Sequence, residues 1–85
     1  GINRGDKPPM VTVAADASIW IDDKIVPDVD LARRIKELVE NAPDDGIILK
    51  GDEGADYGVV VRVLDIARSV GAKGIQMSAD RPPEQ

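Results

Sequence analysis

The sequence predicts one small α+β domain in which two helices pack on one face of a mixed sheet. Three observations support this class. Apolar residues alternate with polar or small ones over residues 10–21, they recur at helical spacing over residues 28–43 and 56–71, and strand-like segments flank the second helical stretch. The expected element order is ββαβαβ. A chain of 85 residues is long enough for a single hydrophobic core.

The segment "MVTVAADASIWID" is expected to form two strands joined by a turn near Asp16. Its period-two alternation is typical of strands that are covered on one face. The apolar side chains on that face are those of Val11, Val13, Ile19 and Ile21. The following "KIVP" is expected to extend the second strand until Pro27 ends it, because proline cannot donate a ladder hydrogen bond.

A first helix is expected over "PDVDLARRIKELVENAP". Asp28 stands where an N-terminal cap is expected, and Pro43 closes the segment. The apolar positions that recur at helical spacing are Leu31, Ile35, Leu38 and Ala42. The next apolar run, Ile47–Leu49, is continuous, which predicts a central strand covered on both faces.

The segment "DYGVVVRVLDIARSVGAKG" contains three adjacent valines, yet the spacing of its charges favours a helix. Asp56 is placed to cap the N-terminus and Gly71 to end the helix in a left-handed conformation. The apolar stripe consists of Val60, Val63, Leu64, Ala67 and Val70, with Val59 and Ile66 at its margin. Valine costs less than about 0.7 kcal/mol of helix propensity per residue, which burial of such a stripe outweighs.

A last strand is expected at "IQMSA", where Ile75 and Met77 alternate with polar residues. The second half of the chain is then a βαβ unit with two parallel strands and a right-handed crossover. Edge strands at Met10–Ala15 or Ile75–Ser78 are expected to accept a strand from another chain. The candidate edge residues for a partner or a second copy are Val11, Val13, Ile75 and Met77.

The composition argues against several classes of function. The formal charge of −5, with 16 acidic and 11 basic residues, disfavours nucleic-acid binding. The absence of Cys and His removes the commonest transition-metal ligands and the commonest general base, so no catalytic residue, cofactor or metal is expected and the protein is predicted not to be an enzyme. No apolar stretch approaches the roughly 20 residues of a membrane-spanning helix.

Several motifs have a structural and a functional interpretation. "GDEGAD" at residues 51–56 is interpreted as a strand-to-helix turn, because it lacks the register of an EF-hand or of a phosphate loop. "RGD" at residues 4–6 is interpreted as part of a solvated tail. Asp65 is expected to anchor Arg62, Arg68 or the neighbouring loop. Trp20 is interpreted as a core residue, with a partner surface on an uncovered sheet face as the alternative.

The string "ILKGDEGADYGVVVRVLDIARSVGAKGIQM" resembles the C-terminal half of the periplasmic domain of the ExbD/TolR family, and "VTVAADASIWIDDKIV" resembles its opening hairpin. The positions that match the family's turn and helix are Asp52, Tyr57, Asp65 and Gly71. Two positions depart from it, since Glu53 stands at the usual Lys and Gly51 at the usual Ala.

The resemblance implies a component of an inner-membrane complex driven by the proton-motive force. On this reading residues 1–9 are a linker from a transmembrane anchor absent from this chain, residues 10–79 are the periplasmic domain, and residues 80–85 are a disordered tail. The implied partners are an ExbB- or TolQ-like channel protein, a TonB- or TolA-like protein, a second copy of the chain, and peptidoglycan for TolR-like members. The alternative is a free-standing α/β regulatory or ligand-binding module.

Overall fold

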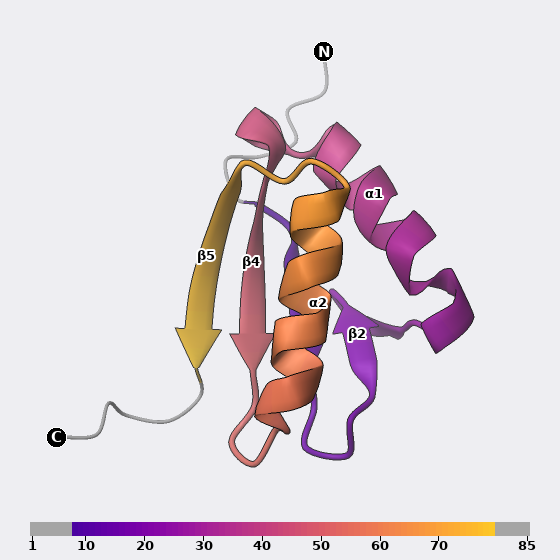
Figure 1. Ribbon diagram of the computed structural model, residues 1–85, viewed down its shortest axis with the longest axis vertical. Helices are drawn as coiled ribbons and strands as arrows, with labels where there is room; N and C mark the ends of the chain where they lie inside the picture. The colour runs from indigo at the N-terminus through magenta and orange to yellow at the C-terminus, as the bar shows by residue number, and fades with distance from the viewer. Residues whose placement is uncertain (1–7, 80–85) are drawn as a thin grey trace, which may run out of the picture.

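The computed structural model describes residues 8–79, which form one five-stranded sheet and two α-helices (Figure 1). The predicted tail at residues 80–85, the RGD tripeptide and most of the predicted linker lie outside the described residues. The elements are β1 (Met10–Val13), β2 (Ile19–Ile21), β3 (Lys24–Ile25), α1 (Leu31–Asn41), β4 (Gly46–Gly51), α2 (Tyr57–Ser69) and β5 (Gly74–Ala79), with short 3₁₀ turns at Asp28–Asp30 and Pro43–Asp45.

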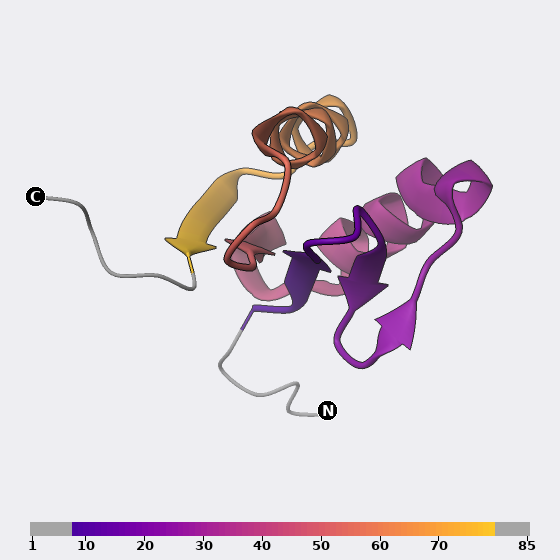
Figure 2. The same cartoon turned by 90° about the horizontal axis from the view of Figure 1, so that it is seen from below.

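The predicted fold class is confirmed. The strand order is β3-β2-β1-β4-β5, in which β1 is antiparallel to β2 and parallel to β4, and β4 is parallel to β5. The view from below shows α1 and α2 on the same face of the sheet, so residues 8–79 form two layers, and no described element covers the other sheet face (Figure 2). The second half of the chain is the expected parallel βαβ unit.

The prediction that β1 is an edge strand is wrong. β1 lies in the middle of the sheet between β2 and β4, and the side chains of Val11 and Val13 are 0% exposed. The reason is that β4 returns after α1 to pair with β1, which removes β1 from the edge that it would have in an isolated hairpin. The edges of the described sheet are β3 and β5.

The prediction that "KIVP" extends the second strand is also wrong. The chain reverses at Asp22 and Asp23, and Asp22 has a φ of 57°. Lys24 and Ile25 therefore form the separate strand β3, antiparallel to β2. Aspartate tolerates the left-handed region better than most residues, which makes a tight turn available at this position.

The helix α1 begins two residues later than predicted, with Asp30 in place of Asp28 at the N-cap position. Residues 28–30 form a 3₁₀ turn, and neither Asp28 nor Asp30 accepts a capping hydrogen bond through its side chain. Asp28 instead accepts two hydrogen bonds from Nη2 of Arg62 in α2, at 2.7 and 2.8 Å. The carboxylate thus joins the beginning of one helical segment to the middle of the other helix.

The predicted helix between Asp56 and Gly71 is confirmed. The Asp56 carboxylate accepts a hydrogen bond of 2.7 Å from the backbone N–H of Gly58, as an N-cap does. At the other end, Gly71 has a φ of 100°, and the N–H groups of Gly71 and Ala72 donate to the carbonyls of Arg68 and Ala67. This pair of hydrogen bonds is a Schellman motif, for which glycine is the favoured residue.

The core lies between the helices and the covered sheet face. Its aliphatic residues come from β1, β2, β4, both helices and the segment after β3, and they are Val11, Val13, Ile19, Ile21, Val26, Leu31, Ile35, Val39, Ile47, Leu49, Val60, Val63 and Ala67. The prediction that β4 is covered on both faces is wrong. Ile47 and Leu49 are buried beneath the helices, whereas Ile48 points to the uncovered face and is only half-buried.

A candidate interaction groove between α2 and β5

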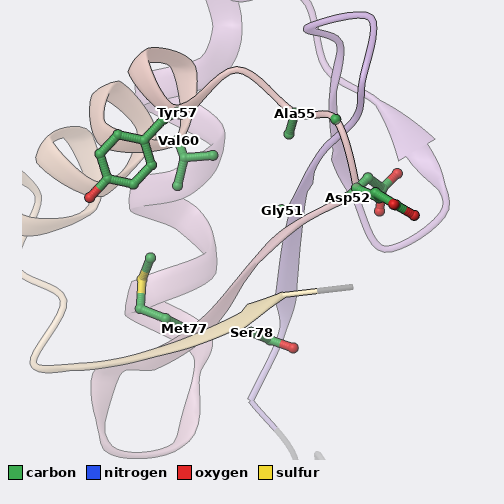
Figure 3. Close-up of a pocket in the computed structure, with 9 residues that line it drawn as sticks. Gly51, Asp52, Ala55, Tyr57, Val60, Met77 and Ser78 are labelled. Atoms are coloured by element: carbon green, nitrogen blue, oxygen red, sulfur yellow. The ribbon is translucent and has the colours of Figure 1, made fainter. Parts of the chain in front are cut away.

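A groove of about 520 Å³ opens between the N-terminal end of α2, the loop before it and strand β5 (Figure 3). Its lining residues come from all three segments and are Gly51, Asp52, Glu53, Gly54, Ala55, Tyr57, Val60, Met77 and Ser78. We call this the α2–β5 groove. Its position follows from the topology, because α2 packs over β4 and reaches β5 only in part.

Apolar side chains form the wall of the α2–β5 groove. Figure 3 shows Met77 pointing from β5 towards Tyr57 and Val60 on the first turns of α2. Tyr57 is 77% exposed and Met77 53% exposed, whereas Val60 is buried. An exposed aromatic ring beside an exposed, flexible thioether is a typical feature of a surface that binds a partner.

Carboxylates lie at the end of the α2–β5 groove formed by the β4–α2 loop. Asp52 is fixed at the end of β4, because its backbone N–H donates to the Val13 carbonyl at 3.0 Å. Glu53 follows it on the exposed turn. Gly54 completes the turn with a φ of 88°, a conformation that glycine adopts without the strain that a Cβ atom would cause.

Gly51 is one of the two positions that depart from the ExbD/TolR pattern. The structure leaves room for a side chain at this position. A Cβ at Gly51 would lie 3.5 Å from the Val60 Cγ2 atom, which is an ordinary van der Waals distance. The glycine at the floor of the groove is therefore not required by close packing there.

The structure brings only some of the predicted site residues together. Asp52 and Tyr57 both line the α2–β5 groove, and Met77 joins them from β5. Asp65 lies on the exposed face of α2, and Gly71 at the far end of that helix. Asp65 does not anchor Arg62, whose partner is Asp28, and it has no ion pair with any residue in the range 8–79.

Strand β5 is an open edge along its outer side. It pairs with β4 from Gly46↔Gly74 to Gly51↔Ala79 and has no neighbour on the other side within the described sheet. Of the four candidate edge residues, Ile75 and Met77 therefore lie on an edge strand. A second hollow, lined by Leu64, Arg68, Ala72, Lys73, Ile75 and Met77, continues along the same strand. The groove and the edge together present an elongated surface beside unpaired backbone groups, with apolar side chains between acidic residues at one end and basic residues at the other.

Two ionisable side chains outside the groove, Arg62 and Asp16, have shifted pKa values because of hydrogen bonds that hold the structure. The hydrogen bonds from Arg62 to Asp28, together with the Asp28 charge, raise the pKa of Arg62 above its usual value. In the β1–β2 turn, hydrogen bonds from the Ser18 hydroxyl and then from the Ser18 N–H lower the pKa of Asp16. The Asp16 carboxylate fixes the geometry of its own turn, and the Arg62 guanidinium links α2 to the segment before α1.

Sequence reasoning missed two features of the surface. It did not combine Tyr57 and Met77 into one groove, since they are twenty residues apart and meet only through the βαβ crossover. It also favoured a core position for Trp20, which instead lies half-buried on the uncovered sheet face. The alternation of Trp20 with Ile19 and Ile21 was the available signal, because it puts the indole on the face opposite the core.

The fold is that of a small α+β domain with several open surfaces. Within residues 8–79, no three carboxylates gather as they would at a metal site, and neither helix has the length and apolar character needed to cross a bilayer. The unusual features are a groove, an open strand edge and an uncovered sheet face, all of which suit contacts with other molecules.

The chain belongs to the ExbD/TolR family, because the family model described as "Biopolymer transport protein ExbD/TolR" matches residues 3–81. It is 32% identical over 73 residues to the biopolymer transport protein exbD2 of Vibrio cholerae serotype O1, a match that covers 86% of this chain and 54% of that protein. It is 29% identical over 68 residues to the biopolymer transport protein ExbD of Escherichia coli K12, covering 80% and 48%. The chain thus spans about half the length of these curated relatives.

Proposed function

We propose that this domain couples the proton-motive force of an inner-membrane complex to a TonB- or TolA-like protein through protein–protein contacts. Family membership supports the setting, since the relatives are named as biopolymer transport proteins. The single observation that supports the mode of action is the open β5 edge beside the exposed Tyr57 and Met77 side chains. These features suit binding and offer no catalytic group.

In this proposal the domain is periplasmic and is held near the inner membrane by an anchor that precedes it. Residues 1–9 act as the linker and residues 10–79 as the coupling domain. The ExbB- or TolQ-like channel protein contacts the anchor, so the domain itself meets the TonB- or TolA-like protein. Proton transfer belongs to the anchor, and none of the carboxylates in this chain is assigned that role.

The β5 edge is the proposed site for strand addition, by a second copy of the chain or by the TonB- or TolA-like protein. Backbone hydrogen bonds to an added strand supply affinity, while side chains on alternate positions enter the α2–β5 groove and supply specificity. Ile75 and Met77 lie on the helix-covered side of β5, as their pairing with Ile47 and Leu49 requires. Their apolar surface would be buried by the added chain.

The role is tested in the native host by deleting the codons for residues 10–79 from the chromosomal gene. Loss of energy-dependent uptake across the outer membrane indicates an ExbD-like role, and sensitivity to detergent indicates a TolR-like role, in which binding to isolated peptidoglycan is the next measurement. A deletion strain that keeps both uptake and envelope integrity, with the deletion verified, would exclude the proposal.

The proposed edge is tested with two charge insertions on the same strand. Met77→Glu places a carboxylate in the α2–β5 groove, and Gln76→Glu places one on the uncovered face of β5. We expect Met77→Glu to weaken self-association, or binding to the TonB- or TolA-like protein, by about tenfold, which corresponds to ~1.4 kcal/mol. Analytical ultracentrifugation and titration calorimetry measure both. Equal losses in the two variants would argue against the groove.

A further inference from the structure

The uncovered sheet face carries the only tryptophan of the sequence. Trp20 in β2 pairs with Thr12 in β1 and Ile25 in β3, so the three side chains share this face. Ile25 is exposed, and Trp20 is half-buried although no helix lies over it. An indole in this position presents a large aromatic surface next to solvent.

Hydrogen bonds fix the polar edge of the Trp20 ring. The indole Nε1–H donates to the Ser18 hydroxyl oxygen at 2.9 Å, and that hydroxyl donates in turn to the Asp16 carboxylate. The Ser18 N–H donates to the same Asp16 oxygen at 3.0 Å. The indole donor is therefore already satisfied within the turn, and the ring is held in one orientation.

A shallow pocket of about 350 Å³ lies beside this ring and is lined by Thr12, Ala14, Trp20, Asp22 and Asp52. We call it the Trp20 pocket. Its two carboxylates come from opposite sides of β1. Each is attached to backbone that is fixed by a hydrogen bond, since the Asp22 N–H donates to the Met10 carbonyl at 3.1 Å and the Asp52 N–H to the Val13 carbonyl at 3.0 Å.

The two carboxylates of the Trp20 pocket form no direct ion pair within the described part of the chain. Neither Asp22 nor Asp52 forms an ion pair with any residue in the range 8–79, whereas five other carboxylates there do, those of Asp28, Asp30, Glu37, Glu40 and Asp45. Lys50 lies on the same sheet face but does not line the pocket. An aromatic surface flanked by two carboxylates repels anions and attracts cations.

We propose that the Trp20 pocket binds an arginine side chain of a partner protein, stacked on the Trp20 ring with its positive charge between Asp22 and Asp52. A guanidinium suits the pocket better than an ammonium because it is planar, stacks on aromatic rings and presents donors in a fork that matches a carboxylate. The exposed Ile25 beside the ring extends the contact to a protein surface. The Trp20 ring lies on the sheet face opposite the α2–β5 groove, and Asp52 lines both hollows. The proposal does not depend on the energy-coupling role.

The single tryptophan makes the site directly observable. The probe is an acetylated, amidated Gly-Arg-Gly tripeptide, titrated into the ¹⁵N-labelled chain at low ionic strength while the indole N–H resonance of Trp20 is followed. We expect the Trp20 resonance to shift until the pocket is saturated. Raising the salt concentration at least tenfold should largely abolish this shift, because salt screens charge interactions at the surface. The matched tripeptide with citrulline in place of arginine keeps the shape without the charge and should give no saturable shift.

Three isosteric variants separate the pocket from the general negative charge of the domain. Asp22→Asn and Asp52→Asn each remove one pocket carboxylate, and asparagine tolerates the left-handed conformation of residue 22. Glu53→Gln removes the same charge next to Asp52 but outside the Trp20 pocket. We expect the first two to weaken tripeptide binding at least threefold and Glu53→Gln to leave it unchanged. Putrescine, a diamine, tests whether any cation binds in the pocket. The proposal would be overturned if the citrulline tripeptide or putrescine shifted the Trp20 resonance as much as the arginine tripeptide does. Equal effects of all three variants on tripeptide binding would also overturn it.

Discussion

The two sides of the helix-covered sheet face differ in how much of their apolar surface the helices bury. Leu49 in β4 and Met77 in β5 are partners in neighbouring strands and point to the same face, yet Leu49 is 0% exposed and Met77 53%. Neighbouring strands are only about 4.8 Å apart. The boundary between the core and the surface therefore lies between β4 and β5, where α2 no longer covers the sheet. One side supplies stability, and the other leaves apolar surface for a partner.

The largest effect is expected from shortening the residue on the covered side. Leu49→Ala removes a fully buried side chain and leaves a cavity beneath the helices, which should lower the free energy of unfolding by about 2–5 kcal/mol. Met77→Ala, its partner on the open side, should lower it by less than about 1 kcal/mol. Urea denaturation followed by circular dichroism measures both. Similar losses in the two variants would show that β5 belongs to the core.

The next largest loss of stability is expected at the start of α2, and it can be compared with the loss at the acidic residue before α1. Asp56→Ala removes the N-cap of α2 and should cost about 1 kcal/mol of stability. Asp28→Ala removes an exposed ion pair with Arg62 and no cap, so its effect should be clearly smaller. The same denaturation experiment ranks them. A larger loss for Asp28→Ala would mean that the link between the helices stabilises the fold more than the cap does.

A gain in stability is expected in the β1–β2 turn. Ala17 has a φ of 74°, a conformation that costs residues with a Cβ atom more than it costs glycine. Ala17→Gly should therefore raise the free energy of unfolding by about 0.5–1 kcal/mol. The matched change in the same turn is Ala15→Gly, because residue 15 does not have a positive φ. This change should not raise the free energy of unfolding, since glycine loses more conformational entropy on folding than alanine does. Equal shifts in thermal midpoint would contradict this account.

The smallest effect is a pH dependence of the same turn. The Ser18 hydrogen bonds lower the pKa of Asp16 below its usual 3.8, so the stability that they supply is complete above that pH and is lost as the pH falls through the lower folded-state pKa. In Ser18→Ala the Asp16 pKa should return towards 3.8, as measured from the carboxyl chemical shift during an NMR titration. An unaltered titration would show that these hydrogen bonds do not cause the shift.

Most local elements of this fold can be predicted from the sequence, with the exception of the turn that separates β3 from β2 and the exact start of α1. The valines at residues 59–61 were assigned correctly because the charges around them follow helical spacing and the cap residues Asp56 and Gly71 mark both ends. Asp28 was misassigned as a cap because its side chain is used in a contact with Arg62, 34 residues away. A pairing of that kind depends on how two helices pack and leaves no local pattern.

Sheet order and sheet cover were harder to predict than the strands themselves. Nothing in the spacing of Val11 and Val13 tells which later strand will pair with β1, so a central strand was expected at an edge. The run Ile47–Leu49 suggested cover on both faces, although the second face has no helix above it. The α2–β5 groove was also not predicted, because it depends on how far α2 extends across the sheet.

The parallel pairing of β1, β4 and β5 has a mechanical consequence. β1 and β5 run in the same direction on either side of β4, so the beginning of β1, beside Ile48, and the end of β5, beside Gly51, are offset along the strand direction by three residues of β4. A pull exerted between Met10 and Ala79 would load both ladders in shear, with their hydrogen bonds sharing the tension instead of opening one by one. Such a domain resists being unzipped when it is stretched between its two termini.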